Sequence, residues 1–242
     1  MPIPSEIEVE FEKQLRNFRA EVIHAVHCFS IILASREEIF PNPDTHKAIQ
    51  AQGTTNFWAT TLESAETSLI LTLTRVFENN SANSINQIMR RISQNGEALF
   101  SSAALTKRKF NLANPAQGEQ VSKYPIIPGK VPSPSLAREI AVVLREHREH
   151  YVNQLMIVRN NWLAHREVDE DDIWGYLQVA LHTEPLTKMV GFLCEFERQL
   201  FGLYWNGAAT NVERLKSPPE LHSDMGSQMR RLIFGPYTSQ PS

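Results

Sequence analysis

The chain of 242 residues has only two cysteines, Cys28 and Cys194, and each lies within an apolar helical pattern. Two cysteines in such surroundings are too few for a disulfide framework or a cysteine-based metal cluster, so we expect both to be reduced core residues. The sequence also lacks an apolar run near the ~20 residues that a membrane span needs. Its first ten residues are acidic where a signal peptide would be basic. We therefore expect a cytoplasmic protein with no membrane association.

Positive charge is not in excess either, because 24 Lys and Arg face 27 Asp and Glu and the formal net charge is −3. A basic field over the whole protein, which would attract nucleic acid, is thereby excluded, and any such contact needs a local patch. Arginine nevertheless outnumbers lysine by 16 to 8. The guanidinium fork suits phosphate and carboxylate groups, so this composition leans weakly toward an anion-binding surface.

Several common catalytic motifs are missing. The sequence has no Gly-rich phosphate loop, no Gly-x-Ser-x-Gly elbow and no Cys-x-x-Cys pair, which argues against P-loop enzymes, elbow-type hydrolases and zinc ribbons. His147 and His150 share a helix face, but a metal site would need a third and a fourth ligand. The charges around them are typical of a solvated face, and we expect no metal site.

Apolar residues recur at steps of three and four, which predicts amphipathic helices, and no convincing alternating strand pattern occurs. A capping box of Ser5 and Glu8 opens the first helix, and Pro41 and Pro43 stop it. Its apolar stripe is Phe11, Leu15, Phe18, Val22, Val26, Phe29 and Leu33. Residues 41–53, rich in Pro, Asn, Asp and Gly, are expected to form a connector.

A second helix is expected from about residue 54 to the turn at 78–81. A short helix should run from a Ser84–Gln87 capping box to residues 95–96, and another from about 97 to 109. A proline-rich loop at 111–134 follows. Ser133 and Pro134 then begin a helix whose stripe continues to Trp162, and a last helix starts near residue 183. We expect one all-α domain over residues 1–207, a bundle of about four long helices with short inserted helices, and a C-terminal tail over 208–242.

The segment Met156–Glu167, MIVRNNWLAHRE, is polar in the middle of an otherwise apolar helical stripe. It is either the end of a helix, where Arg159 and His165 cap carbonyls and pair with carboxylates, or a site that needs both side chains. Six residues along a straight helix place them about 120° apart and ~9 Å apart along the axis. They would meet only if the helix breaks at the weak helix formers Asn160 and Asn161, or if a second subunit contributes the same residues.

Residues Arg159 to His165, RNNWLAH, resemble the Arg-polar-(four to six)-His motif of HEPN domains, a superfamily of small helical bundles. The sequence pattern Arg-Asn-x-x-Leu-Ala-His-Arg is similar to that of HEPN proteins from bacterial abortive-infection and toxin–antitoxin systems. The resemblance also includes Phe57-Trp58, the end of the second helix at residues 71–77 and the helix that begins at Ser84. It covers roughly residues 50–205.

The resemblance implies a symmetric homodimer that cleaves RNA without a metal or other cofactor and leaves a 2′,3′-cyclic phosphate. His165 would act as acid or base, Arg159 would hold the phosphate, and Asn160 would orient the arginine, the histidine or the phosphate. Arg75 and Arg166 are candidate RNA-binding residues, and Arg90, Arg91 and Arg108 could add positive charge. An antitoxin protein is a further expected partner.

Two other functions stay open. Some HEPN domains serve as non-catalytic dimeric interaction or nucleotide-binding modules, and the chain could also be a helical scaffold unrelated to HEPN. Glu167 stands where certain HEPN toxins have a tyrosine that an antitoxin modifies, which argues against that mode of control. The acidic run 169–172 is expected to cap the following helix rather than to bind a cation.

Overall fold

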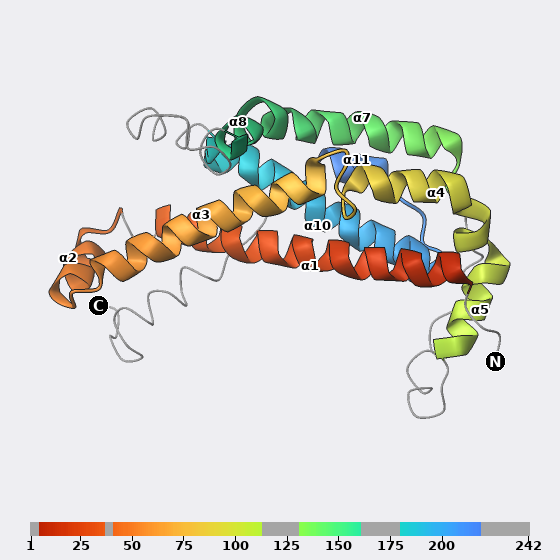
Figure 1. The fold of residues 1–242 in the computed structure, drawn as a ribbon, viewed down its shortest axis with the longest axis horizontal. Helices are drawn as coiled ribbons and strands as arrows, with labels where there is room; N and C mark the ends of the chain where they lie inside the picture. Colours follow the sequence, from red (N-terminus) through yellow and green to blue (C-terminus); the bar gives the residue numbers. More distant parts are fainter. Residues whose placement is uncertain (1–4, 37–40, 113–130, 161–179, 219–242) are drawn as a thin grey trace. The chain divides into compact units, whose positions relative to one another are not determined.

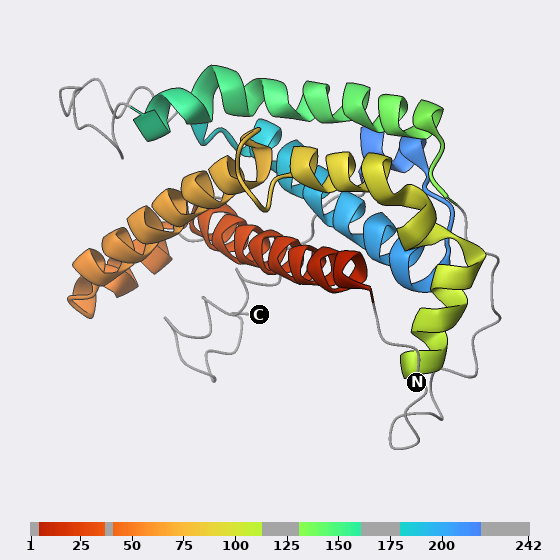
Figure 2. The same cartoon turned by 45° about the vertical axis from the view of Figure 1, so that its right-hand side comes forward.

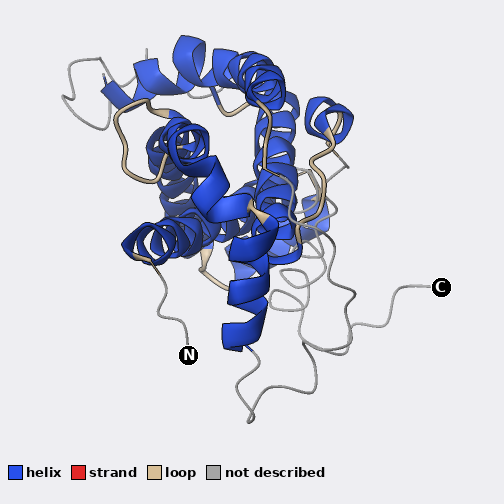
Figure 3. Ribbon diagram, turned by 90° about the vertical axis from the view of Figure 1, so that its right-hand side faces the viewer, coloured by secondary structure: helices blue, strands red, loops and turns tan. Residues whose placement is uncertain are grey.

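The computed structural model describes residues 5–36, 41–112, 131–160 and 180–218, and all regular structure in these ranges is helical (Figure 3). The helices in chain order are α1 (Glu6–Ala34), α2 (Pro43–Ala51), α3 (Thr55–Phe77), α4 (Ile85–Phe100), α5 (Ser102–Leu112), α7 (Pro134–His150), the π-helical turn η2 (Tyr151–Leu155), α8 (Met156–Val158), α10 (Thr183–Asn206) and α11 (Val212–Lys216) (Figure 1). The prediction of an all-α fold is confirmed for these residues. None of their helices is long and apolar enough to cross a membrane.

The helices form two compact units that alternate along the chain. The first contains the part of α1 up to Val22, the described residues between Arg75 and Glu149, and those from Gly191 onward. The second contains the rest of α1, α2, α3 up to Thr74, and the described residues between His150 and Val190. The expectation of a single domain over residues 1–207 stays a prediction.

Aromatic rings fill the core of the first unit. Phe11 of α1 packs against Phe100 of α4 and Tyr204 of α10, with ring centroids 5.8 and 5.2 Å apart. Such pairs contribute about 0.5–1.5 kcal/mol each beyond the area that they bury. Helices α4 and α7 lie next to each other in two views (Figures 1 and 2), and Ile92, Ile140 and Leu200 from α4, α7 and α10 line one apolar cavity.

The predicted N-termini of helices that are capped by nearby side chains are confirmed. The Ser5 backbone N–H donates to Oε2 of Glu8 at 2.8 Å, and Oγ of Ser5 accepts from the Glu8 N–H at 3.3 Å, which is a complete capping box. Oγ of Ser133 accepts from the Leu136 N–H ahead of α7. At α4 only half of the box forms, because the Gln87 side chain donates to the Asn79 carbonyl instead of returning to Ser84.

Helix α2 is a correction, since residues 41–53 were expected to be a connector. Oδ1 of Asn42 accepts from the backbone N–H groups of Asp44 and Thr45, and Pro43 occupies the first helical position. A proline there starts a helix rather than stopping one. The short helix is held by a satellite core in the second unit, formed by Ala34, Ile49, Ile31, Ala48 and Trp58. Because so few apolar residues are involved, no periodic pattern marks α2 in the sequence.

The end of α4 is a second correction. Residues 95–96 do not close the helix, which kinks at Asn95 (φ −125°, ψ 21°) and continues to Phe100. Leu99 and Phe100 are buried, and this burial stabilises the additional turn. The short helix expected over 97–109 is therefore α5, which begins after Ser101, whose Oγ accepts from the Ala104 N–H.

In α1 the apolar stripe drifts. Val26 and Leu33 are half-buried, while Ala25 and Ile32 take the buried positions. A helix of 3.6 residues per turn rotates away from a strict three-and-four spacing over a length of 29 residues. The proline-rich loop at 111–134 lies largely outside the described residues, and the acidic run 169–172 lies wholly outside them. The expected C-terminal tail contains the short helix α11.

Candidate functional site

The helix that carries Arg159 and Asn160 departs from α-helical geometry before it reaches Arg159. At the π-helical turn, the Met156 backbone N–H donates to the Tyr151 carbonyl, five residues back. Residues 159–160 are π-helical again. A break at 160–161 was one of the two alternatives considered for the motif, and this irregularity lies before that point, with Tyr151 and Leu155 buried within it. π turns inside α-helices are frequent at functional sites.

Arg159 and Asn160 contact each other in the last described residues of this helix. Nη1 of Arg159 donates a hydrogen bond of 2.6 Å to Oδ1 of Asn160, and both residues are half-buried beside the buried Val158. The carboxamide oxygen of Asn160 is a neutral acceptor, and it fixes the direction of one arm of the guanidinium fork. Asn160 was expected to orient the arginine, the histidine or the phosphate. Within the described residues, its contact with the arginine is present.

His165 and Arg166 lie outside the described residues. Within the described ranges, no group of three or more His, Cys, Asp or Glu side chains is arranged to hold a metal ion.

The sequence suggested that the two histidines of α7 lie on a solvated face. In the structure, both are half-buried and lie beside backbone carbonyls. His147 Nε2 lies 3.2 Å from the Leu215 carbonyl, and its ring stacks on Phe192 with centroids 4.5 Å apart. His150 Nε2 lies 2.8 Å from the carbonyl of Ala180. Since a carbonyl only accepts, each Nε2 must carry the hydrogen. Burial lowers the pKa of His150, and nearby His182 adds to this, while the bond to Ala180 opposes it.

Arg36 lies two residues beyond the end of α1, and the sequence analysis did not identify it as a candidate site residue. Its Nη1 donates to the Leu181 carbonyl at 2.7 Å, and its Nη2 donates to Oε1 of Glu66 at 2.6 Å. Burial raises the pKa of the Glu66 carboxyl, which Arg36 opposes and Glu63 reinforces. His150 and Arg36 therefore bind two consecutive carbonyls, those of Ala180 and Leu181. No sequence signal reveals these contacts, because the partners are 30 and 145 residues apart.

Arg75 and Arg91 each have a carboxylate partner. Arg75 donates from Nε and Nη2 to the two carboxylate oxygens of Glu21, each at 2.8 Å. Its contact with RNA stays a prediction, and RNA would have to share or break this ion pair. Arg91 makes a surface ion pair with Glu10 at 3.2 Å.

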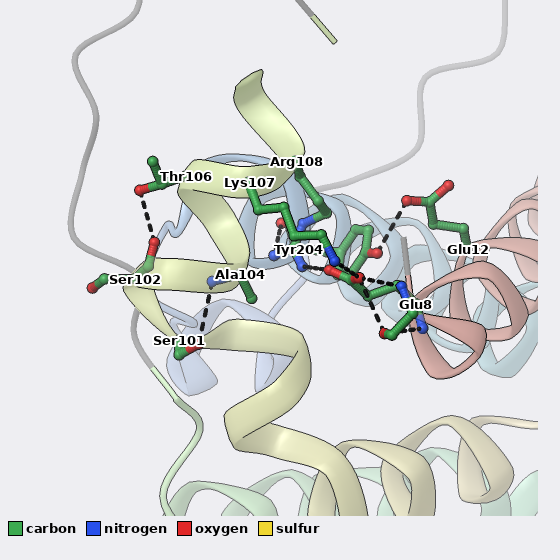
Figure 4. Close-up of polar contacts among 10 residues, drawn as sticks. Glu8, Glu12, Ser101, Ser102, Ala104, Thr106, Lys107, Arg108 and Tyr204 are labelled. Carbon is green, nitrogen blue, oxygen red and sulfur yellow. Dashed lines mark hydrogen bonds and ion pairs between the residues drawn. The ribbon is translucent and has the colours of Figure 1, made fainter. Parts of the chain in front are cut away.

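Arg108 is only 5% exposed, so it does not add charge to the surface. Its guanidinium lies over the Tyr204 ring, 4.0 Å from the centroid, and its Nη2 donates to the Tyr204 carbonyl (Figure 4). Glu8 faces it at 3.6 Å and also accepts from Lys107 at 3.1 Å. This buried polar cluster joins the first turn of α1 to α5 and α10.

An all-α fold with a half-buried Arg-Asn pair on an interrupted helix, followed in sequence by a histidine, defines a helical protein of the HEPN class. The family comparison agrees and is more specific. The chain belongs to the AbiU2 family of HEPN proteins, the abortive-infection type, whose family model matches residues 8–196. The match begins in α1, upstream of the resemblance at residues 50–205. No curated protein and no solved structure matches the chain.

Proposed function

We propose that the protein is a metal-independent RNA endonuclease, a toxin or phage-defence effector that acts as a cytoplasmic homodimer through Arg159, Asn160 and His165. The observation that carries the proposal is the 2.6 Å contact of Arg159 with Asn160 in a chain of this family. It holds a charged fork in one orientation on a helix with a buried face.

The chemistry uses groups that these side chains supply. Histidine side chains can exchange protons near neutral pH, and His165 takes the proton of the 2′-hydroxyl or donates one to the leaving 5′-oxygen. The 2′-oxygen forms a bond to phosphorus while the bond to the 5′-oxygen breaks, which leaves a 2′,3′-cyclic phosphate and a 5′-hydroxyl. Arg159 stabilises the charge that develops on the phosphoryl oxygens.

A dimer supports this reaction in two ways. One histidine cannot be base and acid in the same step, whereas a two-fold arrangement provides His165 from each subunit. It also removes the difficulty that side chains six residues apart on a regular helix point in directions about 120° apart. With a net charge of −3, RNA would be bound by local cations, for which Arg166 and Arg75 are the candidates.

The test is cleavage of RNA in EDTA by the wild type, His165→Ala and Arg159→Ala. His27→Ala removes an exposed histidine of α1 and is the matched control. We expect both motif variants to lose cleavage, His27→Ala to keep it, and the product to carry a 2′,3′-cyclic phosphate. Equal activity of wild type and His165→Ala would refute the catalytic assignment. A stable dimer that neither cleaves nor binds RNA is what the interaction-module alternative predicts.

A control by an antitoxin is part of the proposal. A nuclease of this kind harms its own cell, so a partner protein is expected to cover or block the site. Expression of the wild type without such a partner should arrest growth, while His165→Ala should not.

A further inference from the structure

A polar cleft lies in the first compact unit, between the beginning of α1 and the kinked part of α4. Its volume is about 230 Å³. Since drug-sized ligands occupy pockets of about 300–1,000 Å³, this cleft suits a smaller group, of the size of one nucleobase. Helix α1 contributes Ile7, Glu10 and Phe11, which lie three and four residues apart and therefore share one helix face.

The α4 wall of the cleft is formed at the kink. Arg91, Gln94 and Asn95 line it with the same spacing of three and four residues. Nδ2 of Asn95 donates at 3.3 Å to the Arg91 carbonyl, which a regular helix pairs with the Asn95 backbone N–H. A side chain that enters the helical hydrogen-bond pattern is a common cause of a kink, and α4 bends at Asn95.

An acceptor and a donor stand side by side in this cleft. Nη1 of Arg91 lies 3.2 Å from Oε2 of Glu10, and the two side chains are 39% and 58% exposed, so a ligand can reach both. The contact uses one terminal atom of each group. A carboxylate has about four acceptor positions and a guanidinium has five N–H donors, so both groups can bind a ligand while they keep their mutual contact.

The floor of the cleft is apolar. Phe11 and Leu99 line it and are 0% exposed, and Ile7 adds an apolar side chain that is 41% exposed. A flat ligand with an apolar face and a hydrogen-bonding edge matches a floor of this kind beside a charged pair. Unpaired nucleobases have this character, since proteins bind their faces by stacking or apolar contact and their edges by hydrogen bonds.

We propose that this cleft binds a guanine base through Glu10 and Arg91. The Watson–Crick edge of guanine has two neighbouring donors, N1–H and the 2-amino group, followed by the acceptor O6. The carboxylate of Glu10 accepts from both donors, and the adjacent Arg91 donates to O6. Adenine, cytosine and uracil each have one donor group on this edge, so guanine alone uses both carboxylate oxygens. The base belongs to single-stranded RNA or to a free guanine nucleotide, and the inference does not depend on RNA cleavage.

The test for the free nucleotide is an NMR titration of the full-length protein with GMP, IMP and AMP. Hypoxanthine, the base of IMP, differs from guanine only by the missing 2-amino group, so it loses one of the two hydrogen bonds to Glu10. We expect GMP to bind about 5- to 10-fold more tightly than IMP. This is the low end for a bidentate contact, because the charged pair is partly exposed. AMP should bind no better than IMP.

The test for RNA uses His165→Ala, so that the substrate is not cleaved. A heptauridylate with one central guanosine is compared with the same RNA carrying inosine at that position. A preference for guanosine only in RNA identifies an RNA base as the ligand, and a preference only among free nucleotides identifies a nucleotide.

Three variants assign the preference to the cleft. Glu10→Gln removes the double acceptor and should make guanine and hypoxanthine bind about equally. Arg91→Lys keeps the charge but loses the fork, and should weaken guanine binding about 5-fold. Glu6→Gln is the matched control, because Glu6 is another exposed carboxylate of α1 and does not line the cleft. It should keep the full preference.

Equal binding of guanine and hypoxanthine in both tests would overturn the proposal. A preference that persists in Glu10→Gln, guanine binding unchanged in Arg91→Lys, or a preference lost in Glu6→Gln would also overturn it. Failure of the wild type to cleave RNA would refute the proposed function and leave the guanine site standing.

Discussion

The guanidinium of Arg159 donates to the carboxamide oxygen of the residue that directly follows it, Asn160, at 2.6 Å. Neighbouring side chains on a helix point about 100° apart, so they do not normally meet. The long arginine side chain reaches across this angle where the helix is π-helical. The contact restricts the arginine to one direction, and this orientation is the property that a phosphate-binding role requires.

Substitution of Asn160 should therefore act through Arg159. A hydrogen bond to a charged group contributes about 1.5–3 kcal/mol, so Asn160→Ala should lower the cleavage rate about 10- to 100-fold. Asn160→Asp keeps the acceptor but adds a negative charge that pairs with Arg159. It should weaken RNA binding more than Asn160→Ala does. Cleavage rates and RNA affinities of the two variants check this, and wild-type values in both would contradict a role for the contact.

Glu8 should be the most sensitive carboxylate of the buried polar cluster in Figure 4. Glu8→Gln leaves Arg108 buried opposite a neutral group, and removal of one partner of a buried pair costs about 3–5 kcal/mol. Glu10→Gln, on the same helix, breaks a surface pair with Arg91 and should cost at most about 1 kcal/mol. Urea denaturation of both variants measures the difference. Equal midpoints would show that burial of the Glu8 pair does not matter for stability.

Glu195 should make part of the stability dependent on pH. Burial raises the pKa of this carboxyl, but hydrogen bonds from Arg198 and Gln199 and the charge of Arg214 outweigh it, and the pKa lies below its usual range. Its contribution is then present above the ordinary glutamate pKa of about 4.3 and is lost as the pH falls through the lower folded value. The stability difference between wild type and Glu195→Gln should be largest above about pH 5. A difference that grows on acidification would contradict the sign.

Both cysteines should be unreactive in the folded protein. Burial raises the pKa of Cys194 to about 11, with a contribution from Glu197, and burial also raises the pKa of Cys28. Because the thiolate is the reactive form, labelling with a thiol reagent at pH 8 should be slow. Denaturation in urea should make both thiols react at the rate of a free cysteine. Rapid labelling of either one in the native state would show that it is accessible and ionised.

The beginnings of the helices could be predicted because they depend on neighbours. The Ser5–Glu8 box and the Ser133 cap of α7 involve residues three positions apart, so the sequence alone contains both partners. The apolar stripes predicted the all-α class for the same reason. The motif from Arg159 to His165 could likewise be recognised. The contact between Arg159 and Asn160 joins residues that are adjacent in the sequence.

Only the tertiary structure decided the contacts between distant residues. The helical kink at Asn95 persists because Leu99 and Phe100 are buried beyond it, and Arg108 lies in the core because Tyr204 and Glu8 surround it. The hydrogen bonds that the Ala180 and Leu181 carbonyls accept come from His150 and Arg36, which are far away in sequence. The sequence by itself determined the helix starts at Ser5 and Ser133 and which residues could do chemistry, since these follow from interactions within one turn. Which polar groups are buried and satisfied follows from packing between helices that no local pattern encodes.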